Sequence, residues 1–292
     1  MRVVITGTTG YVATHLARAL EAKGHQASLI SVRDEAWRSL DFTGADAVVH
    51  TAALLHGQGK GQPWEAFERV NVRLTEQIAQ KARDEGVPRF LFMSTLHVYG
   101  LEDAPRGVRA LHLIGPDTPC APASHYACSK LEAERALERL ESPSFSVLRV
   151  RCPMVYGVRC PGNYAMLRKI ALKLRVYPAF DNQRAMVHVD SLCAFLIACV
   201  ERGISGVAHP QDQAPVCTAD MIACIARANG VKAYASRLLG ALVPLAAAVL
   251  PPARKAFGSV AVDLALSDIG VDYRAGDLAA CVALCEPWEA RP

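Results

Sequence analysis

The sequence has no cysteine motif of the metal-binding or redox type, no long apolar run and no run of basic residues, and each absence excludes a class of protein. Its 10 cysteines form no C-x-x-C motif and no paired Cys/His spacing. This excludes a disulfide framework or a metal site and predicts small buried thiols in a reducing cytoplasm. No apolar stretch reaches about 20 residues, so no membrane span is predicted. The net charge is only +4 and basic residues adjoin at most in pairs, so nucleic acid is not an expected partner.

Two apolar segments need separate interpretation. The run Val3–Ile5 is followed at once by a glycine turn, unlike a signal peptide. The stretch 238–250 is apolar throughout but short, and Pro244 interrupts it. A packed helix or a lid over a substrate is therefore expected there, and contact with a membrane surface is the less favoured alternative. With 292 residues, 51% of them hydrophobic, the chain can form one large domain or a domain with a smaller annex.

A glycine turn stands between a predicted strand and a predicted helix at the N-terminus. Val3-Val-Ile is a buried-strand run, Thr6-Gly7-x-x-Gly10 follows, and residues 11–20 have a helical pattern. Gly7 permits a tight turn, and Gly10 lets the backbone approach a pyrophosphate at the helix N-terminus. This order of elements is the context that a dinucleotide-binding fingerprint requires.

The next two predicted strands end in residues that would choose and hold the cofactor. The strand 27–33 ends with Ser31 and Arg33 where NAD-binding folds usually carry an acid, so NADP is slightly favoured over NAD. A solvated loop position for Arg33 is an equal alternative. The strand within 45–53 ends in Thr51, Ala52 and Ala53, which leave room for a flat ring or a ribose. A flexible loop, 54–63, and a long helix, 64–85, with Asn71 on its inner side are expected next.

A tyrosine and a lysine stand four residues apart at the start of a helix predicted over 126–140. Positions i and i+4 share a helix face, so Tyr126 and Lys130 can reach one reacting atom. The lysine charge would lower the pKa of the phenol and make it a general base. The strand 89–95 ends in two hydroxyls, of which Thr95 is preferred over Ser94 as a partner for Tyr126. The alternatives are a solvated Tyr/Lys pair, hydroxyls that only cap the strand end, and a structural His97.

The second half of the chain alternates less regularly. A fifth strand at 146–151 leads into Pro153-Met154-Val155, and helices are expected around 166–174, 191–201 and 218–228, with a strand around Val207. We therefore expect a cofactor-binding domain over 1–155, its sheet completed by parts of 180–210, and a mainly substrate-binding annex over 156–292.

An ordered set of motifs resembles the extended short-chain dehydrogenase/reductases of the nucleotide-sugar epimerase/dehydratase group. The set comprises Thr6-Gly7-x-x-Gly10-Tyr11, Asp41-Phe42, His50-x-Ala-Ala53, Asn71-Val72, Ser94-Thr95-x-x-Val-Tyr-Gly100, Tyr126-x-x-x-Lys130, Arg151-x-Pro-x-Val-Tyr-Gly157 and Arg184-x-x-x-His188-Val-Asp190. The resemblance spans residues 1 to about 275. It implies an α/β fold, a Rossmann-type doubly wound parallel sheet with a small C-terminal α/β substrate domain.

The resemblance also implies residue roles. Tyr126 would be the acid/base, Thr95 its hydroxyl partner, and Lys130 the ligand of the nicotinamide ribose. Asp41-Phe42 would contact adenine, and Arg184 would pair with a substrate diphosphate. The expected cofactor contacts are Gly7, Thr9, Gly10, Tyr11, Val12, Ser31, Arg33, Asp41, Phe42, Thr51, Ala52, Ala53, Asn71, Tyr126, Lys130, Pro153 and Val155. The expected substrate contacts are Leu55, Thr95, His97, Tyr126, Met154, Asn163 and Arg184.

Departures from the family pattern narrow the expected reaction. Leu96-His97 replace the acidic pair that follows the threonine in dehydratases, so dehydration is set aside. Ala13 takes the third glycine position, Ser31 that of the NAD-type acid, and Met154 that of an asparagine near the sugar in many galactose epimerases. The sequence thus predicts an NAD(P)-dependent 4-epimerase of a UDP- or dTDP-hexose.

Three alternatives to that 4-epimerase remain. The first is an NADPH-dependent reductase of a nucleotide-linked 4-keto sugar. The second is a non-catalytic NADP-binding sensor. The third is an enzyme for a lipid-linked sugar, which only the stretch 238–250 suggests. A homodimer through the helices 64–85 and 126–140 is usual for the family and is expected here.

Overall fold

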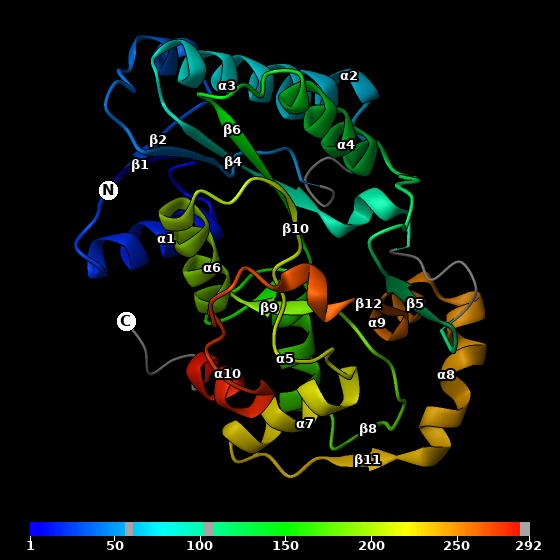
Figure 1. Ribbon diagram of the computed structural model, residues 1–292. Coiled ribbons are helices and arrows are strands. Elements are labelled where there is room, and N and C mark those ends of the chain that lie inside the picture. Colours follow the sequence, from blue (N-terminus) through cyan, green and yellow to red (C-terminus); the bar gives the residue numbers. More distant parts are fainter. Residues whose placement is uncertain (56–60, 102–107, 287–292) are drawn as a thin grey trace.

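The central element is a six-stranded parallel sheet with helices on both faces (Figure 1). The computed structural model describes residues 1–55, 61–101 and 108–286, so the loop expected over 54–63 lies partly outside the described residues. Along the sheet the strands are β2 (Gln26–Ile30), β1 (Arg2–Thr6), β3 (Ala47–His50), β4 (Arg89–Thr95), β6 (Ser146–Cys152) and β10 (Gly206–Ala208). The strand order changes direction between β1 and β3, which is where ligands bind in doubly wound sheets. The predicted fold class is confirmed.

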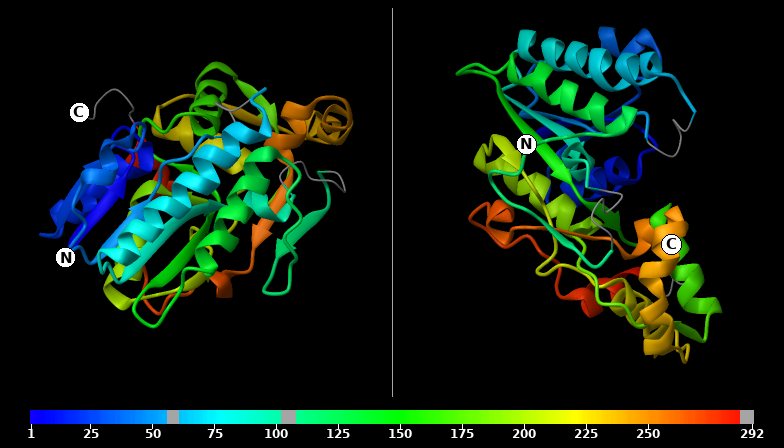
Figure 2. Two further views of the ribbon diagram at one scale, coloured as in Figure 1. Left: turned by 90° about the horizontal axis from the view of Figure 1, so that it is seen from above. Right: turned by 90° about the vertical axis from the view of Figure 1, so that its right-hand side faces the viewer.

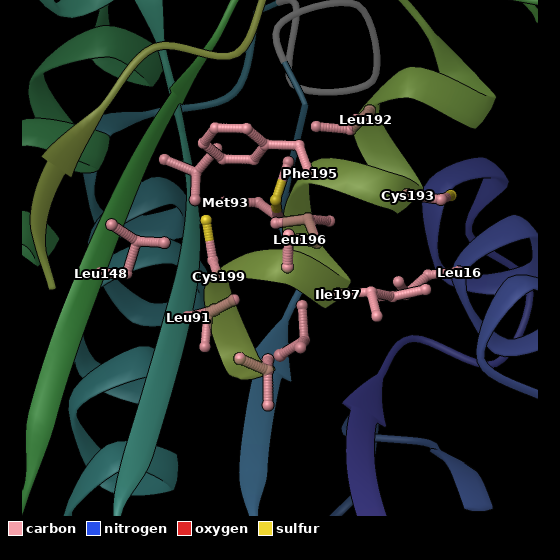
Figure 3. Packing of buried hydrophobic residues seen from close by; sticks show 14 of the residues in the cluster. Leu16, Leu91, Met93, Leu148, Leu192, Cys193, Phe195, Leu196, Ile197 and Cys199 are labelled. Atoms are coloured by element: carbon pink, nitrogen blue, oxygen red, sulfur yellow. The ribbon is translucent and has the colours of Figure 1, made fainter. Parts of the chain in front are cut away.

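Side chains along each strand point alternately to the two faces of the sheet, so the apolar core is divided between those faces. Leu91 and Met93 of β4 pack with α1 (Tyr11–Ala22) and α6 (Val189–Arg202), as Figure 3 shows for Leu16, Phe195 and their neighbours. The intervening Phe90 and Phe92 pack on the other face against the helices between β3 and β4 and after β4. Because successive side chains of a strand point to opposite faces, one apolar run supplies both cores.

The predicted helix 64–85 forms as three joined segments. These are α2 (Trp64–Phe67), a π-helical segment (Glu68–Arg73) and α3 (Leu74–Asp84). Next to them lies α4 (His125–Glu138), which begins where the Ser124 hydroxyl accepts a hydrogen bond of 3.2 Å from Ala127 N. Such a cap satisfies a backbone donor that has no partner inside the helix. Helix α4 and the π-helical segment contact one another on this face of the sheet (Figure 1).

The remaining elements form a second layer below the sheet (Figure 2). The helices α5 (Asn163–Lys173), α7 (Thr218–Ala228) and α10 (Leu278–Cys285) share one apolar cluster. Three short parallel pairs join distant segments: β5 (Leu111–Ile114) with β12 (Ser259–Val262), β7 (Met154–Tyr156) with β9 (Met186–His188), and β8 (Val176–Pro178) with β11 (Tyr234–Ser236). Two more helices, α8 (Arg237–Val249) and α9 (Pro251–Phe257), form the outer edge (Figure 1). Within the described ranges, no helix has the length and apolarity needed to cross a bilayer.

Candidate active site

The glycine turn after β1 forms a cradle for an anion. Gly7 has φ +99°, a left-handed conformation, and a Cβ there would stand 3.1 Å from the Thr51 hydroxyl. Gly10 precedes α1, and no side chain caps this helix end. The first-turn N–H groups and the helix dipole thus point at the sheet edge where β1 ends. The turn packs closely against Thr51, which leaves no room for a side chain at position 7. The bare backbone and the helix N-terminus therefore fit the pyrophosphate of a dinucleotide.

Arg33 lies beside this turn. Its Nη2 donates to the Thr9 hydroxyl at 3.5 Å, and the Ser31 hydroxyl accepts from Arg33 N at 3.4 Å. The guanidinium is exposed and reaches the phosphate cradle from the end of β2. A cation in that place can meet a 2′-phosphate, whereas an acidic residue would repel it.

Tyr11 links the first turn of α1 to the segment after β7. Its hydroxyl donates to Val158 O at 3.0 Å, and burial raises the pKa of this phenol. The ring needs Gly157, because a Cβ at that position would stand 2.6 Å from the Tyr11 hydroxyl oxygen. Val12 and Val155 are half-buried and pack, like Tyr11, against the apolar cluster between α1 and the sheet. The hydroxyl of Tyr11 is therefore committed to holding two ligand-side segments together.

A buried polar chain fixes the strand ends below the glycine turn. The Thr6 hydroxyl lies 2.8 Å from Nδ1 of His50, whose Nε2 lies 3.0 Å from the Thr75 hydroxyl. Thr51 donates its hydroxyl to Thr6 O, and both Thr51 N and Ala52 N donate to the Thr6 hydroxyl. Burial and the nearby Lys130 charge lower the pKa of His50 to about 3, so the imidazole is neutral. Thr51, Ala52 and Ala53 are half-buried and follow β3 directly.

Asn71 sits in the π-helical segment and uses its whole amide inside the protein. Oδ1 accepts from Leu54 N at 2.7 Å, and Nδ2 donates to Leu54 O at 3.1 Å and to the Ser129 hydroxyl at 2.9 Å. The Ser129 hydroxyl in turn donates to Tyr126 O at 2.8 Å. π-Helical turns occur often at functional sites. Here the turn aims an amide that ties the segment after β3 to the helix of Tyr126, which is an indirect role rather than the predicted cofactor contact.

The three predicted catalytic side chains come together where β4 and β6 end. The Thr95 side chain lies beside the Tyr126 hydroxyl, whose pKa it lowers, and the ring of His97 meets the Tyr126 ring edge-on at 6.0 Å between centroids. Lys130 is 2% exposed, one turn along α4, with its Nζ 4.3 Å from the centre of the Phe92 ring. The Thr95 hydroxyl also accepts from His97 N at 3.3 Å, so the capping role and the contact with Tyr126 coexist.

The pKa values of Tyr126 and Lys130 differ from the expectation. Burial, with the Cys152 thiol as a second cause, raises the pKa of Tyr126 to about 12, although the Thr95 hydrogen bond lowers it. Burial lowers the pKa of Lys130 to about 7, against the opposing charge of Glu134. Since Lys130 is only partly charged near neutral pH, it stabilises a phenolate less than a full charge would. In the ligand-free protein, burial therefore outweighs any lowering of the Tyr126 pKa by Lys130.

A second buried network lies beside the catalytic group. Glu134 accepts from the Ser94 hydroxyl and forms a two-pronged salt bridge with Arg151, with Nη2–Oε2 at 2.7 Å. Arg151 Nη1 donates to the Tyr99 hydroxyl at 2.8 Å, and that oxygen lies 2.8 Å from Nε2 of His209. Ser94 is thus occupied by Glu134, which leaves Thr95 as the strand-end hydroxyl that reaches Tyr126.

Asp41 and Phe42 do not lie where the resemblance implied. Arg2, at the start of β1, donates through Nη2 to Asp41 O at 3.0 Å, and Phe42 is 1% exposed in the core. This is the amino edge of the sheet, opposite the glycine turn. Because Phe42 is covered by the core and Asp41 is at the far edge, neither contacts an adenine bound over Gly7. That expectation is wrong.

Of the other expected substrate contacts, Arg184, Met154 and Asn163 belong to the second layer, whereas Leu55 follows β3 of the central sheet. Arg184 Nη1 donates to Lys255 O at 2.6 Å and Ala256 O at 3.0 Å, so this nitrogen holds the last turn of α9 rather than a ligand. Pro153 and Met154 are half-buried where β6 passes into β7. Asn163 is exposed at the first turn of α5, and Leu55 is 48% exposed after β3.

Sequence reasoning missed the residues that position the site. Thr6, Thr75, Ser129 and Glu134 are all buried and hydrogen-bonded to predicted site segments. Glu134 had a sequence signal, because it stands four residues after Lys130 on the same helix. The hydroxyls had none, since serine and threonine at those positions also suit any strand end or helix.

Comparison with known proteins identifies the family and the fold. The model of the NAD-dependent epimerase/dehydratase family matches residues 3–209. UDP-glucose 4-epimerase from Vibrio cholerae is 28% identical over 248 residues, 75% of this chain and 73% of that protein. MoeE5 in complex with UDP-glucose and NAD has a TM-score of 0.70 at 20% identity, over 99% of this chain and 98% of its own. A human epimerase family protein with NADPH has a TM-score of 0.73 at 19% identity, over 98% of this chain and 100% of its own.

The family is NAD-dependent, which gives a nicotinamide dinucleotide as the class of cofactor. The neighbours in structure include both an NAD and an NADPH complex. Homologues of this kind are epimerases, dehydratases and reductases, so the protein is an enzyme of the sugar-nucleotide epimerase and oxidoreductase kind. With 207 of its 292 residues matched by the family model, the chain belongs to the NAD-dependent epimerase/dehydratase family.

Proposed function

We propose that the protein is an NAD(P)-dependent 4-epimerase of a nucleotide-linked hexose. The observation that carries this proposal is the placement of Thr95 beside the Tyr126 hydroxyl with Lys130 one helical turn away, all at the carboxyl edge of the sheet that also holds the glycine turn. The similarity to UDP-glucose 4-epimerase supports a UDP- or dTDP-sugar as the substrate.

In this proposal each side chain has one task at the sugar. The nicotinamide, when bound, exchanges a hydride with carbon 4 and brings a positive charge in its oxidised form. Tyr126 takes the proton of the 4-hydroxyl and returns it, and Thr95 orients the same oxygen by hydrogen bonding. Lys130 binds the cofactor ribose. The pKa of Tyr126, about 12 in the ligand-free protein, must fall so that the phenolate forms and can accept the proton, and a positive charge nearby lowers it.

The substrate is proposed to lie between the two layers. Leu55, His97, Met154 and Asn163 would contact the sugar nucleotide, and residues 156–292 would form most of the substrate-binding annex. Arg184 is proposed to support this annex through α9, because its Nη1 is already bonded to two carbonyls.

The position of Arg33 favours NADP over NAD, and a substitution tests this. Arg33→Ala should weaken NADPH binding by about 10–100-fold, since a hydrogen bond to a charged group contributes about 1.5–3 kcal/mol, and should leave NADH binding unchanged. Fluorescence titration of the reduced cofactors measures both. Arg38→Ala is the matched control, because Arg38 pairs with Glu35 and Gln77 instead of the glycine turn. Equal losses for both cofactors would refute the preference.

A 4-ketosugar reductase is the second candidate, and Ser31 with Arg33 favours it because reductases consume NADPH. The two activities differ in cofactor behaviour. An epimerase keeps its cofactor and shows no net redox change, whereas a reductase oxidises one NADPH per product. A non-catalytic sensor would need none of Thr95, Tyr126 and Lys130.

The experiment that tests the proposal starts with the purified protein. Released nicotinamide is identified after denaturation, and the native protein is incubated with UDP-glucose, UDP-GlcNAc and 4-keto-6-deoxy sugar nucleotides. Interconversion of 4-epimers without net change in cofactor absorbance is expected. Oxidation of added NADPH only with a 4-keto sugar would replace the epimerase by the reductase, and inactivity with all of them would favour the sensor.

A further inference from the structure

Helix α8 carries two apolar faces, and among the residues that the structure describes only one of these faces is covered. Gly240, Val243 and Ala247 are buried and face Phe180 and Val108. A Cβ at Gly240 would stand 2.0 Å from Ala179 O, so the helix rests directly on backbone there. At 100° per residue these three positions share one side of the helix. The attachment fixes which side of α8 points outward.

The outward side is a stripe of large aliphatic residues. Leu238, Leu242, Leu245 and Val249 are 75%, 50%, 68% and 72% exposed, and their spacing places them within an arc of about 60° opposite the buried face. Leu250, 54% exposed, continues the stripe into the turn before α9. Contiguous exposed apolar surface of this kind marks an interaction site in soluble proteins.

The chain segment that includes the stripe has ionisable residues of one sign only. Between residues 221 and 262 the sequence has five basic residues and no Asp or Glu. Four of the basic side chains are exposed: Arg227, Lys232, Arg237 and Lys255. The whole chain has a net charge of +4, so the residues outside this segment are close to neutral. A hollow of about 330 Å³ next to Gly240 and Ala241 is lined by Arg109 and Asp181, whose opposite charges cancel.

We propose that α8 docks on an anionic lipid bilayer, with its leucine stripe in the headgroup–acyl boundary and the exposed basic side chains of α8 and α9, Arg237 and Lys255, on the lipid headgroups. Interfacial helices combine an apolar face with Lys and Arg in this way. An exposed Tyr234, 64% accessible in β11 just before α8, suits the same boundary. A helix of 13 residues is about 20 Å long, too short to span the bilayer, so it lies on the surface. A second copy of the chain would present the same positive charge and be repelled.

Vesicle co-sedimentation of the full chain tests the docking. Binding is expected to phosphatidylglycerol-containing vesicles, weakly to pure phosphatidylcholine, and less in high salt. The variant Leu242→Glu with Leu245→Glu should bind the anionic vesicles at least about tenfold more weakly, because two leucines that would be buried in the bilayer are lost. Leu264→Glu with Val271→Glu is the matched control, since these exposed aliphatic residues lie outside the stripe. It should bind like the wild type.

Three outcomes would overturn the inference. The wild type fails to bind anionic vesicles, the stripe variant binds as well as the control, or the stripe variant turns a dimer into a monomer in light scattering while the wild type binds no vesicles. The last outcome assigns the face to a contact between copies. The measurement needs no substrate, so its failure leaves the proposed function untouched.

Discussion

Tyr126→Phe is expected to lower kcat for 4-epimer interconversion by about 10²–10⁴-fold, the usual contribution of a positioned acid/base. Phenylalanine keeps the ring that meets His97 edge-on, and it removes only the hydroxyl that lies beside Thr95. The substrate proton then has no acceptor at the reacting oxygen. Steady-state kinetics measure kcat, and the unfolding midpoint verifies that the variant is folded.

Tyr234→Phe is the control for this substitution, because Tyr234 is exposed in β11 and its variant should retain full activity with a soluble substrate. Thr95→Val should act in the same direction as Tyr126→Phe, since it removes the hydroxyl partner and keeps the shape. A Tyr126→Phe enzyme with wild-type kcat would remove the phenol from the mechanism and revive the sensor hypothesis.

Glu134→Gln is expected to lower the free energy of unfolding by about 3–5 kcal/mol, because it leaves the charge of Arg151 buried and uncompensated. Glu134 is 2% exposed and bonds Arg151 through both oxygens while accepting from Ser94. Burial makes removal of one partner costly, since water does not replace it. Urea denaturation measures the loss.

Glu138→Gln is the matched control one turn further along the same helix. Glu138 pairs with Arg149 at 3.2 Å, but its side chain is 60% exposed, and such surface pairs contribute about 0–1 kcal/mol. The double variant Glu134→Gln with Arg151→Met should recover part of the stability, because no charge is then left unpaired. Equal unfolding free energies for Glu134→Gln and Glu138→Gln would contradict the assignment of a structural ion pair.

The motifs that sequence reasoning located well are local in the chain. Tyr126 and Lys130 share a helix, Gly7 and Gly10 share a turn, and helical periodicity or the conformational freedom of glycine fixes their relative positions. The sequence offers no physical reason to prefer Thr95 over Ser94. The structure supplies a physical reason, because Ser94 is held by Glu134.

The expectation for Asp41-Phe42 failed because it depended on the path of a connection. Between the end of β2 at Ile30 and the start of β3 at Ala47, the chain must return from the carboxyl edge of the sheet to its amino edge. Parallel strands require this return. A short segment makes it directly, so residues 41–42 reach the amino edge and Phe42 enters the core.

The sequence by itself determined the parallel α/β fold, the glycine cradle and the Tyr126/Lys130 pair, since strand runs, glycine turns and helical spacing are properties of neighbouring residues. Only the tertiary structure decided that Asn71 is an internal clamp, that Arg184 supports α9 and that burial raises the pKa of Tyr126. It alone also decided that one side of α8 stays uncovered. Burial, hydrogen bonding and charge compensation at each of these residues depend on groups far apart in the chain, so they are determined only when the elements pack together.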